Sequence, residues 1–177
     1  GARIEQSLQR LNSYTLTDDA VQVDQDLLDV LPAFNLIIKP TEKTNVRVSA
    51  SQTLARPSLR EFAPFQFFDF QQQATIAGNP NLRRTLIQNF DLRYEYFTGP
   101  GEVVSVSAFY KRFGNAIEET LFPQQSEIVR SFANASGAAN NYGVELEVRQ
   151  SLGVNAKPLS NFILSLIGTL INSEITV

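Results

Sequence analysis

The stretch "DLRYEYFTGPGEVVSVSAFYK", residues 91–111, decides the fold, because apolar and polar side chains alternate on both sides of Thr98-Gly99-Pro100-Gly101. Side chains of a β-strand point to opposite faces with a period of two. The stretch therefore predicts a β-hairpin with one apolar and one polar face. The even-numbered positions form the apolar face: Leu92, Tyr94, Tyr96, Val104, Val106, Ala108 and Tyr110.

The same alternation recurs along the whole chain, and most of the alternating segments are longer than strands of soluble proteins. Soluble strands usually have about 5 to 6 residues, whereas a tilted strand that crosses a membrane needs about 9 to 11. The pattern predicts an all-β protein with about seven long antiparallel strands. Besides the hairpin, the alternating segments are 1–7, 33–39, 45–54, 84–97, 141–152 and 161–172.

The links between these segments are alternately short and long. The short links are 40–44, 98–101 and 153–160, and the long links are 8–32, 55–83 and 113–140. An up-and-down barrel in an outer membrane has tight turns at one end and long loops at the other. A soluble β-sandwich has more evenly spaced turns. We therefore expect an up-and-down meander from a transmembrane barrel, with the three long links as external loops that capture a ligand.

The composition excludes several classes of function. The 177 residues contain no Cys and no His, so thiol chemistry, imidazole chemistry and Cys/His metal sites are impossible. The formal net charge of −3 gives no basic surface for nucleic acid. The longest apolar run, 162–171, is about half the length of a membrane-spanning helix. We expect no catalytic residues, no metal and no cofactor, and we expect that the protein is not an enzyme.

Six charged residues lie at odd-numbered positions and share the polar face of the predicted strands. Within one strand they are two residues apart, so neighbouring carboxylates and guanidinium groups could be interpreted as acid/base pairs. Catalysis requires a desolvated and perturbed group, and nothing in the sequence indicates one. The favoured interpretation is a stripe of neutralising charges that faces a water-filled lumen: Arg47, Arg93, Glu95, Glu145, Glu147 and Arg149.

The run "EFAPFQFFDF", residues 61–70, places five phenylalanines inside a predicted external loop. One interpretation is a loop that folds over the mouth of the barrel and buries its own aromatic rings. The other is an exposed aromatic surface that contacts the ligand, because exposed aromatic clusters mark binding sites. The candidate ligand-binding residues are Phe65, Phe67, Phe68 and Phe70.

Four segments of the chain resemble the barrel of TonB-dependent outer-membrane receptors, in particular those of Bacteroidota. They are "LPAFNLIIKPTEKTNVRVSASQTLARPSLREFAPF" (31–65), "GNPNLRRTLIQNFDLRYEYF" (78–97), "VSAFYKRFGNAIEE" (106–119) and "NYGVELEVRQSL" (141–152). The resemblance covers nearly all of residues 1–177. It implies a barrel of about 22 strands that is filled by a plug. It also implies uptake of a scarce nutrient, such as a siderophore, a glycan or a peptide, with energy passed through TonB.

The resemblance further implies that residues 1–177 are an internal part of one receptor barrel, with the plug and the other strands outside this sequence. The expected partners are outer-membrane lipid, the plug of the same parent chain, TonB through that plug, and the nutrient. An isolated segment would have unpaired edge strands, so we expect it to self-associate. Two alternatives remain open at this point. One is a soluble or surface-attached β-sandwich that binds carbohydrate, and the other is an outer-membrane barrel without a plug.

Overall fold

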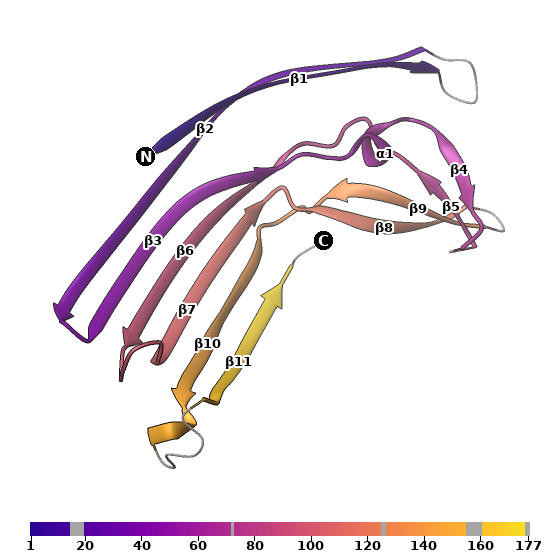
Figure 1. The fold of residues 1–177 in the computed structure, drawn as a ribbon. Coiled ribbons are helices and arrows are strands. Elements are labelled where there is room, and N and C mark those ends of the chain that lie inside the picture. Colours follow the sequence, from indigo (N-terminus) through magenta and orange to yellow (C-terminus); the bar gives the residue numbers. More distant parts are fainter. Residues whose placement is uncertain (15–19, 72, 125–126, 155–160, 176–177) are drawn as a thin grey trace.

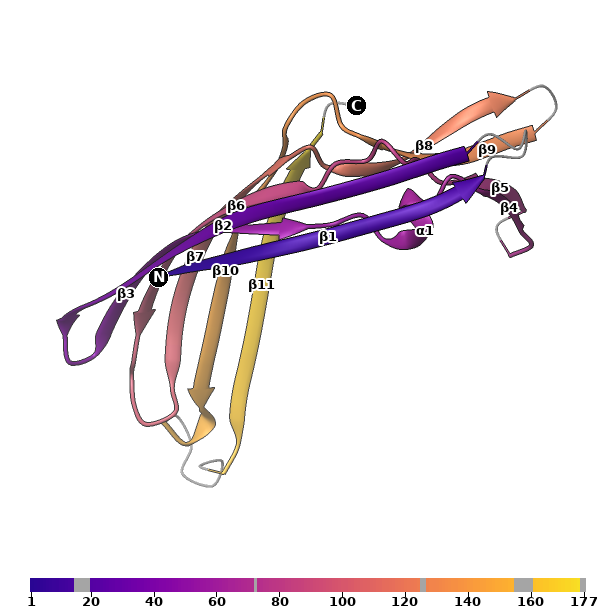
Figure 2. The same cartoon turned by 90° about the horizontal axis from the view of Figure 1, so that it is seen from above.

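A computed structural model describes residues 1–14, 20–71, 73–124, 127–154 and 161–175 of the chain. Its main element is a curved antiparallel sheet of seven strands (Figures 1 and 2). The strands follow one another in the sheet in chain order, which confirms the predicted up-and-down meander. In that order they are β1 (Ala2–Tyr14), β2 (Ala20–Thr41), β3 (Thr44–Ala55), β6 (Thr85–Tyr96), β7 (Val103–Gly114), β10 (Ala139–Ser151) and β11 (Ile163–Glu174).

The short connections of this sheet all lie at one end, which we call the turn end (Figure 1). The turn between β6 and β7 shows how the sequence closes such a connection. Gly101 adopts a positive φ of 78°, and the Glu102 backbone N–H donates to the Gly99 carbonyl at 3.1 Å. The buried Glu102 carboxylate also accepts from Thr98 Oγ1 at 2.9 Å and from the Ser151 N–H at 3.1 Å. Residues 155–160 of the predicted link 153–160 lie outside the described residues.

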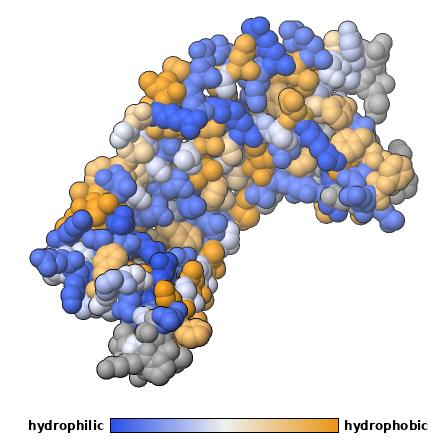
Figure 3. Space-filling view, in the orientation of Figure 1, coloured by the Kyte–Doolittle hydropathy of each residue, from blue (hydrophilic) through white to orange (hydrophobic). Residues whose placement is uncertain are grey.

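The two faces of the sheet differ as the alternation predicts, and the apolar face is the exposed one. In the hairpin of β6 and β7, Leu92 is 51% exposed, whereas Glu95 is 8% exposed and Ser105 is 1% exposed. This arrangement is the reverse of a soluble domain, which buries its apolar side chains. Hydrophilic residues cover much of the side that is turned to the viewer in the space-filling view (Figure 3).

The long connections lie at the opposite end, the loop end, and they are not irregular loops as the sequence had led us to expect. The first of them, 8–32, continues β1 and β2 as one ribbon with an unbroken register from Ala2↔Pro32 to Tyr14↔Ala20. The prediction of a loop was wrong because the alternation of Val21 and Val23 with Gln22 and Asp24 is brief and breaks at Gln25 and at Leu27-Leu28. In the structure the period of two is present, because odd-numbered residues from Val21 to Leu31 are half-buried or buried and the even-numbered ones are exposed.

The other two long connections were also predicted to be loops, and they combine into a second, smaller sheet at the loop end, which we call the loop sheet (Figure 1). A helix of four residues, α1 (Leu59–Phe62), precedes its first strand and starts with a capping box of Ser58 and Glu61. No helix in the described part of the chain is long and apolar enough to span a membrane. The strand order is β4 (Gln66–Asp69), β5 (Ala74–Ala77), β9 (Glu127–Asn134) and β8 (Ile117–Gln124).

The loop sheet and its flanking segments contain most of the buried apolar core. Phe62 is 2% exposed and Leu82 is fully buried, and Ile76 and Val129 are buried as well. The two long links are joined by parallel pairing of β5 with β9, at Thr75↔Val129 and Ile76↔Arg130. Hydrophobic burial therefore stabilises the loop end, while the seven-stranded sheet depends on its hydrogen-bonded ladders.

Neighbouring residues approach the backbone of β10 so closely at position 143 that a glycine is required there. A Cβ at this position would lie 2.8 Å from Cζ of Phe109 and would overlap the Leu170 carbonyl oxygen. Phe109 stands directly opposite in β7, so its ring lies over the glycine backbone. Such a pair of a glycine and an aromatic residue restores contacts that a glycine alone would forfeit in a strand.

We expect Gly143→Ala to destabilise the protein by about 1 to 3 kcal/mol, because the added methyl overpacks this contact. Gly168→Ala in the adjacent β11 is the matched control, because a Cβ there meets nothing within 4 Å. The measurement is urea unfolding in detergent micelles, followed by tyrosine fluorescence because the chain has no Trp. Equal midpoints for the two variants would contradict this account of Gly143.

Candidate functional site

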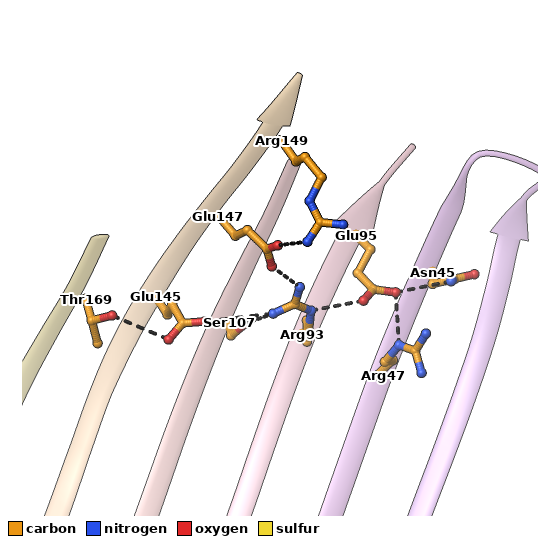
Figure 4. A network of polar contacts seen from close by, with 9 residues as sticks. All are labelled: Asn45, Arg47, Arg93, Glu95, Ser107, Glu145, Glu147, Arg149 and Thr169. Carbon is orange, nitrogen blue, oxygen red and sulfur yellow. Dashed lines mark hydrogen bonds and ion pairs between the residues drawn. The ribbon is translucent and has the colours of Figure 1, made fainter. Parts of the chain in front are cut away.

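An ion-pair network lies on the polar face of the sheet and extends across five strands, from β3 to β11 (Figure 4). Arg93 of β6 is at its centre. Its Nε donates to Oε1 of Glu95 at 3.0 Å, and its Nη2 donates to Oε2 of Glu147 at 2.6 Å. Its Nη1 donates to Oγ of Ser107 at 3.2 Å. Arg93 thus links β6 to β10 across the intervening β7.

The strand register explains why Glu95 is essential to this arrangement. Arg47 and Arg93 stand directly opposite each other in β3 and β6, and like charges at opposed positions destabilise a sheet. Glu95 relieves this repulsion, because it accepts from Nε of Arg47 at 2.9 Å as well as from Arg93. Asn45, which is opposite Glu95, donates its amide to the same carboxylate at 3.1 Å.

The network continues along β10. Arg149 donates to Oε1 of Glu147 at 3.2 Å, and Oε1 of Glu145 lies 3.9 Å from Nη1 of Arg93. Thr169 of β11 donates to Glu145 at 3.4 Å. The structure therefore brings all six predicted lumen-facing residues onto one face and into one network.

The network is neutral overall. Three arginines face three glutamates, and each glutamate contacts an arginine. No glutamate of the network is without a cationic neighbour, so the geometry favours the lining over the acid/base interpretation. Within the described residues, no group of three or more Asp and Glu side chains could hold a metal ion.

A second charged cluster, which the sequence analysis missed, lies where the sheet meets the loop end. Asp29 of β2 is 3% exposed and contacts two arginines, with Arg84 Nε at 2.6 Å and Arg56 Nη2 at 3.4 Å. Arg56 also contacts Glu5 of β1 at 3.0 Å. Arg56 follows β3 and Arg84 precedes β6, so Asp29 holds together both ends of the long link that carries the phenylalanines.

The segment "GNPNL", residues 78–82, fixes the loop sheet to the rest of the chain. A Cβ on Gly78 would overlap the Ala63 carbonyl, so only glycine allows this approach behind α1. The Asn79 N–H donates to the Glu61 carbonyl at 2.7 Å, and its side-chain amide donates to the Phe132 carbonyl at 2.8 Å. One asparagine thereby joins the long link 55–83 to β9.

The structure divides the phenylalanines of 61–70 into a buried and an exposed group. Phe62 belongs to the core, whereas Phe70 is 85% exposed and Phe65 and Phe68 are also exposed. The Phe68 and Phe70 rings meet edge to face with centroids 5.1 Å apart. Phe67 is half-buried and contacts the Arg60 guanidinium, which lies 4.5 Å from its ring centroid. The four candidate ligand-binding residues thus lie on or beside β4, at an edge of the loop sheet.

The model of the family "TonB dependent receptor-like, beta-barrel" matches residues 1–172. The chain belongs to the TonB-dependent receptor family. Membership confirms the family resemblance seen in the sequence, and the Bacteroidota subgroup remains a prediction. This family belongs to the bacterial outer membrane, and it is a family of receptors and transporters. None of the curated protein sequences compared with the chain matches it.

Three solved structures support the same fold. The siderophore receptor PirA of Pseudomonas aeruginosa is 17% identical with a TM-score of 0.70, over 88% of this chain and 31% of PirA. The hemophore receptor HasR of Serratia marcescens is 15% identical with a TM-score of 0.72, over 97% of this chain and 29% of HasR. The iron transporter FrpB of Neisseria meningitidis is 18% identical with a TM-score of 0.59, over 94% of this chain and 22% of FrpB. The chain spans less than a third of the length of each.

We expect Arg93→Gln to lower the free energy of unfolding by about 2 kcal/mol, because charge-assisted hydrogen bonds to two carboxylates are lost. Arg149→Gln is the matched control and should change stability by less than about 0.5 kcal/mol, because it removes one contact at the margin of the network. Unfolding in detergent at low and at high salt would measure both values. An Arg93→Gln effect no larger than that of the control would show that the network does not stabilise the wall.

Proposed function

We propose that residues 1–177 form part of the wall of one receptor barrel, and that this receptor actively takes up a scarce nutrient through the outer membrane. The observation that carries the proposal is the inverted polarity of the sheet. Its exposed side chains are apolar, as a lipid-facing surface requires, and its polar face holds a neutral ion-pair network. Family membership supports the outer membrane as the place where the apolar face would meet lipid.

In this proposal the network of Arg93 faces the lumen and contacts the plug of the same parent chain. A wall that held unpaired charges would pay a desolvation cost when the plug covered it. The network avoids much of that cost because its arginines and glutamates already pair with one another. Energy for transport would reach the plug through TonB, as is general for receptors of this kind.

The loop end would face the outside and meet the nutrient first. Phe65, Phe67, Phe68 and Phe70 are our candidates for ligand contact, since they lie on or beside β4 and three of them are exposed, and exposed aromatic clusters mark binding sites. A siderophore, a glycan and a peptide all remain candidate substrates. The fold similarity to a siderophore receptor and a hemophore receptor supports an iron-bearing nutrient among them.

No specific observation favours the β-sandwich alternative. A sandwich needs a second sheet packed on the apolar face, and the apolar side chains of the described strands are exposed. A barrel without a plug would have the same wall, so the presence of a plug in the parent protein separates that alternative from the receptor. Sucrose-gradient fractionation of cells provides the first test. Recovery of the protein in the soluble or inner-membrane fraction would overturn the proposal.

We expect the double variant Phe68→Ser/Phe70→Ser to lower nutrient uptake at least about tenfold at limiting concentration, because ligand capture loses its apolar contacts. Phe122→Ser on β8, an exposed phenylalanine at the opposite edge of the loop sheet, is the matched control. Uptake of labelled nutrient is measured at equal amounts of receptor in the outer membrane. Uptake by the double variant equal to that of the control would remove the phenylalanines from the binding site.

A further inference from the structure

One edge of β2 has no strand partner among the described residues over Gln22–Val30. Gly1 and Ala33 exchange backbone hydrogen bonds of 2.7 and 2.8 Å, which makes them a hydrogen-bonded pair of the antiparallel ladder. In such a ladder the N–H and C=O of alternate residues point to opposite sides of the strand. The odd-numbered residues of β2 therefore bind β1, and the even-numbered residues direct their backbone groups toward the β3 side.

Pro32 is the residue at which pairing with β3 ends. It is one of the even-numbered residues whose backbone groups point toward the β3 side, but it has no N–H to donate. The β2–β3 register begins at the next residue, with Ala33↔Ser51. The side-chain amide of Gln52 donates to the Val30 carbonyl at 3.3 Å in place of a strand partner. Beyond this point β3 continues with β6, and the backbone groups of Gln22, Asp24, Asp26 and Leu28 face an open space.

A cavity of about 510 Å³ lies along this open edge. Asp24, Gln25, Asp26 and Leu27 form the wall on β2, and the opposite wall consists of Arg83, Arg84, Leu86 and Asn115. The Gln25 amide bridges the two walls by donating to the Leu82 carbonyl at 3.3 Å. The volume is that of a small-ligand site, and its polar groups come from both walls. This distinguishes it from the shallow apolar grooves that run over the lipid side of the sheet.

We propose that this edge binds an extended peptide as an additional antiparallel strand next to β2. The inference rests on the proposed function in one respect, since the peptide must reach the loop end from outside. A row of backbone donors and acceptors at strand spacing is complementary to another extended backbone, which is the basis of β-augmentation. A glycan or a metal chelate cannot match that regular spacing.

The charges of the edge indicate which peptide fits. Asp24 and Asp26 are exposed and are on the same face of β2. Asp24 has Arg10 as a partner at 3.1 Å, whereas Asp26 accepts only the neutral Gln6 amide at 3.2 Å among its described contacts. In an antiparallel pair, residues directly opposite each other share a face. On the opposite wall, Arg84 is already paired with Asp29 at 2.6 Å, and Arg83 is exposed. The peptide therefore carries basic side chains at alternate positions, next to the two aspartates, and its other side chains face Leu27.

The test uses the protein in detergent micelles and a fluorescein-labelled peptide with alternating lysine and valine. Fluorescence anisotropy should detect saturable binding, and a peptide of the same composition with all its lysines first should bind at least about tenfold more weakly. N-methylation of the lysines should abolish binding, because their N–H groups face β2. N-methylation of the valines should preserve it. Equal binding of the two methylated peptides would overturn the proposal.

Leu28→Pro removes an N–H from the open edge and keeps the β1–β2 ladder, as Pro32 already does in the same row. It should weaken peptide binding about tenfold, while the control Leu28→Thr, which keeps the N–H, should stay within about twofold of the wild type. Unchanged binding of the peptide by the Leu28→Pro variant would contradict the inference. So would sedimentation as a dimer that Leu28→Pro converts to a monomer, because the occupant would then be a second copy.

The failure of this inference and the failure of the proposed function give different results. Binding in micelles requires neither TonB nor transport, whereas nutrient uptake by cells requires both. A protein that fractionates with the outer membrane and takes up nutrient, but does not bind the peptide, contradicts only the β2 site. A protein that binds the peptide but is absent from the outer membrane contradicts only the proposed function.

Discussion

The continuous hydrogen-bonded ladder is the constraint on which the rest of the structure depends. A lipid-facing wall has no water to satisfy backbone N–H and C=O groups, so neighbouring strands must satisfy them. β3 and β6 pair without interruption from Thr44↔Tyr96 to Ala55↔Thr85, and β7 and β10 pair from Val103↔Arg149 to Phe113↔Ala139. Because the ladder holds the strands, the side chains need not form a core between sheets. The apolar side chains are therefore free to face lipid.

The ladder also determines the chemistry of the polar face. Fixed registers place Arg47 opposite Arg93, and a sheet with that pairing needs an acidic residue within reach of both. Glu95 meets this need from the same strand as Arg93, and Glu147 repeats the arrangement two strands away. Isolated exposed ion pairs contribute little to stability, but here each guanidinium is held by a strand that the ladder already orders. The entropic cost of pairing is correspondingly small.

The sequence predicted what depends on local periodicity and missed what depends on folding in three dimensions. The two-faced hairpin of 91–111 and the shared face of the six charged residues follow from a period of two, and the structure has both. The loop sheet does not follow from it, because β5 and β9 belong to different links and pair in parallel. The Asp29 cluster was missed for the same reason. Its arginines are far from Asp29 in sequence, and the pairing of β2 with β3 and of β3 with β6 brings them together.

Pro32 marks the boundary between two physical environments. On its turn-end side, β2 has partners on its β3 edge and apolar side chains such as Leu36 that are exposed on the lipid face. On its other side, β2 pairs only with β1 among the described residues, and the same face passes from the exposed Val30 and Leu28 to the acidic Asp26 and Asp24. An unpaired backbone is tolerable only where water can reach it. In the proposed barrel, we therefore expect Pro32, which ends the pairing of β2 with β3, to lie near the membrane surface. A wall strand can continue outward as a ribbon with a free edge only beyond that level.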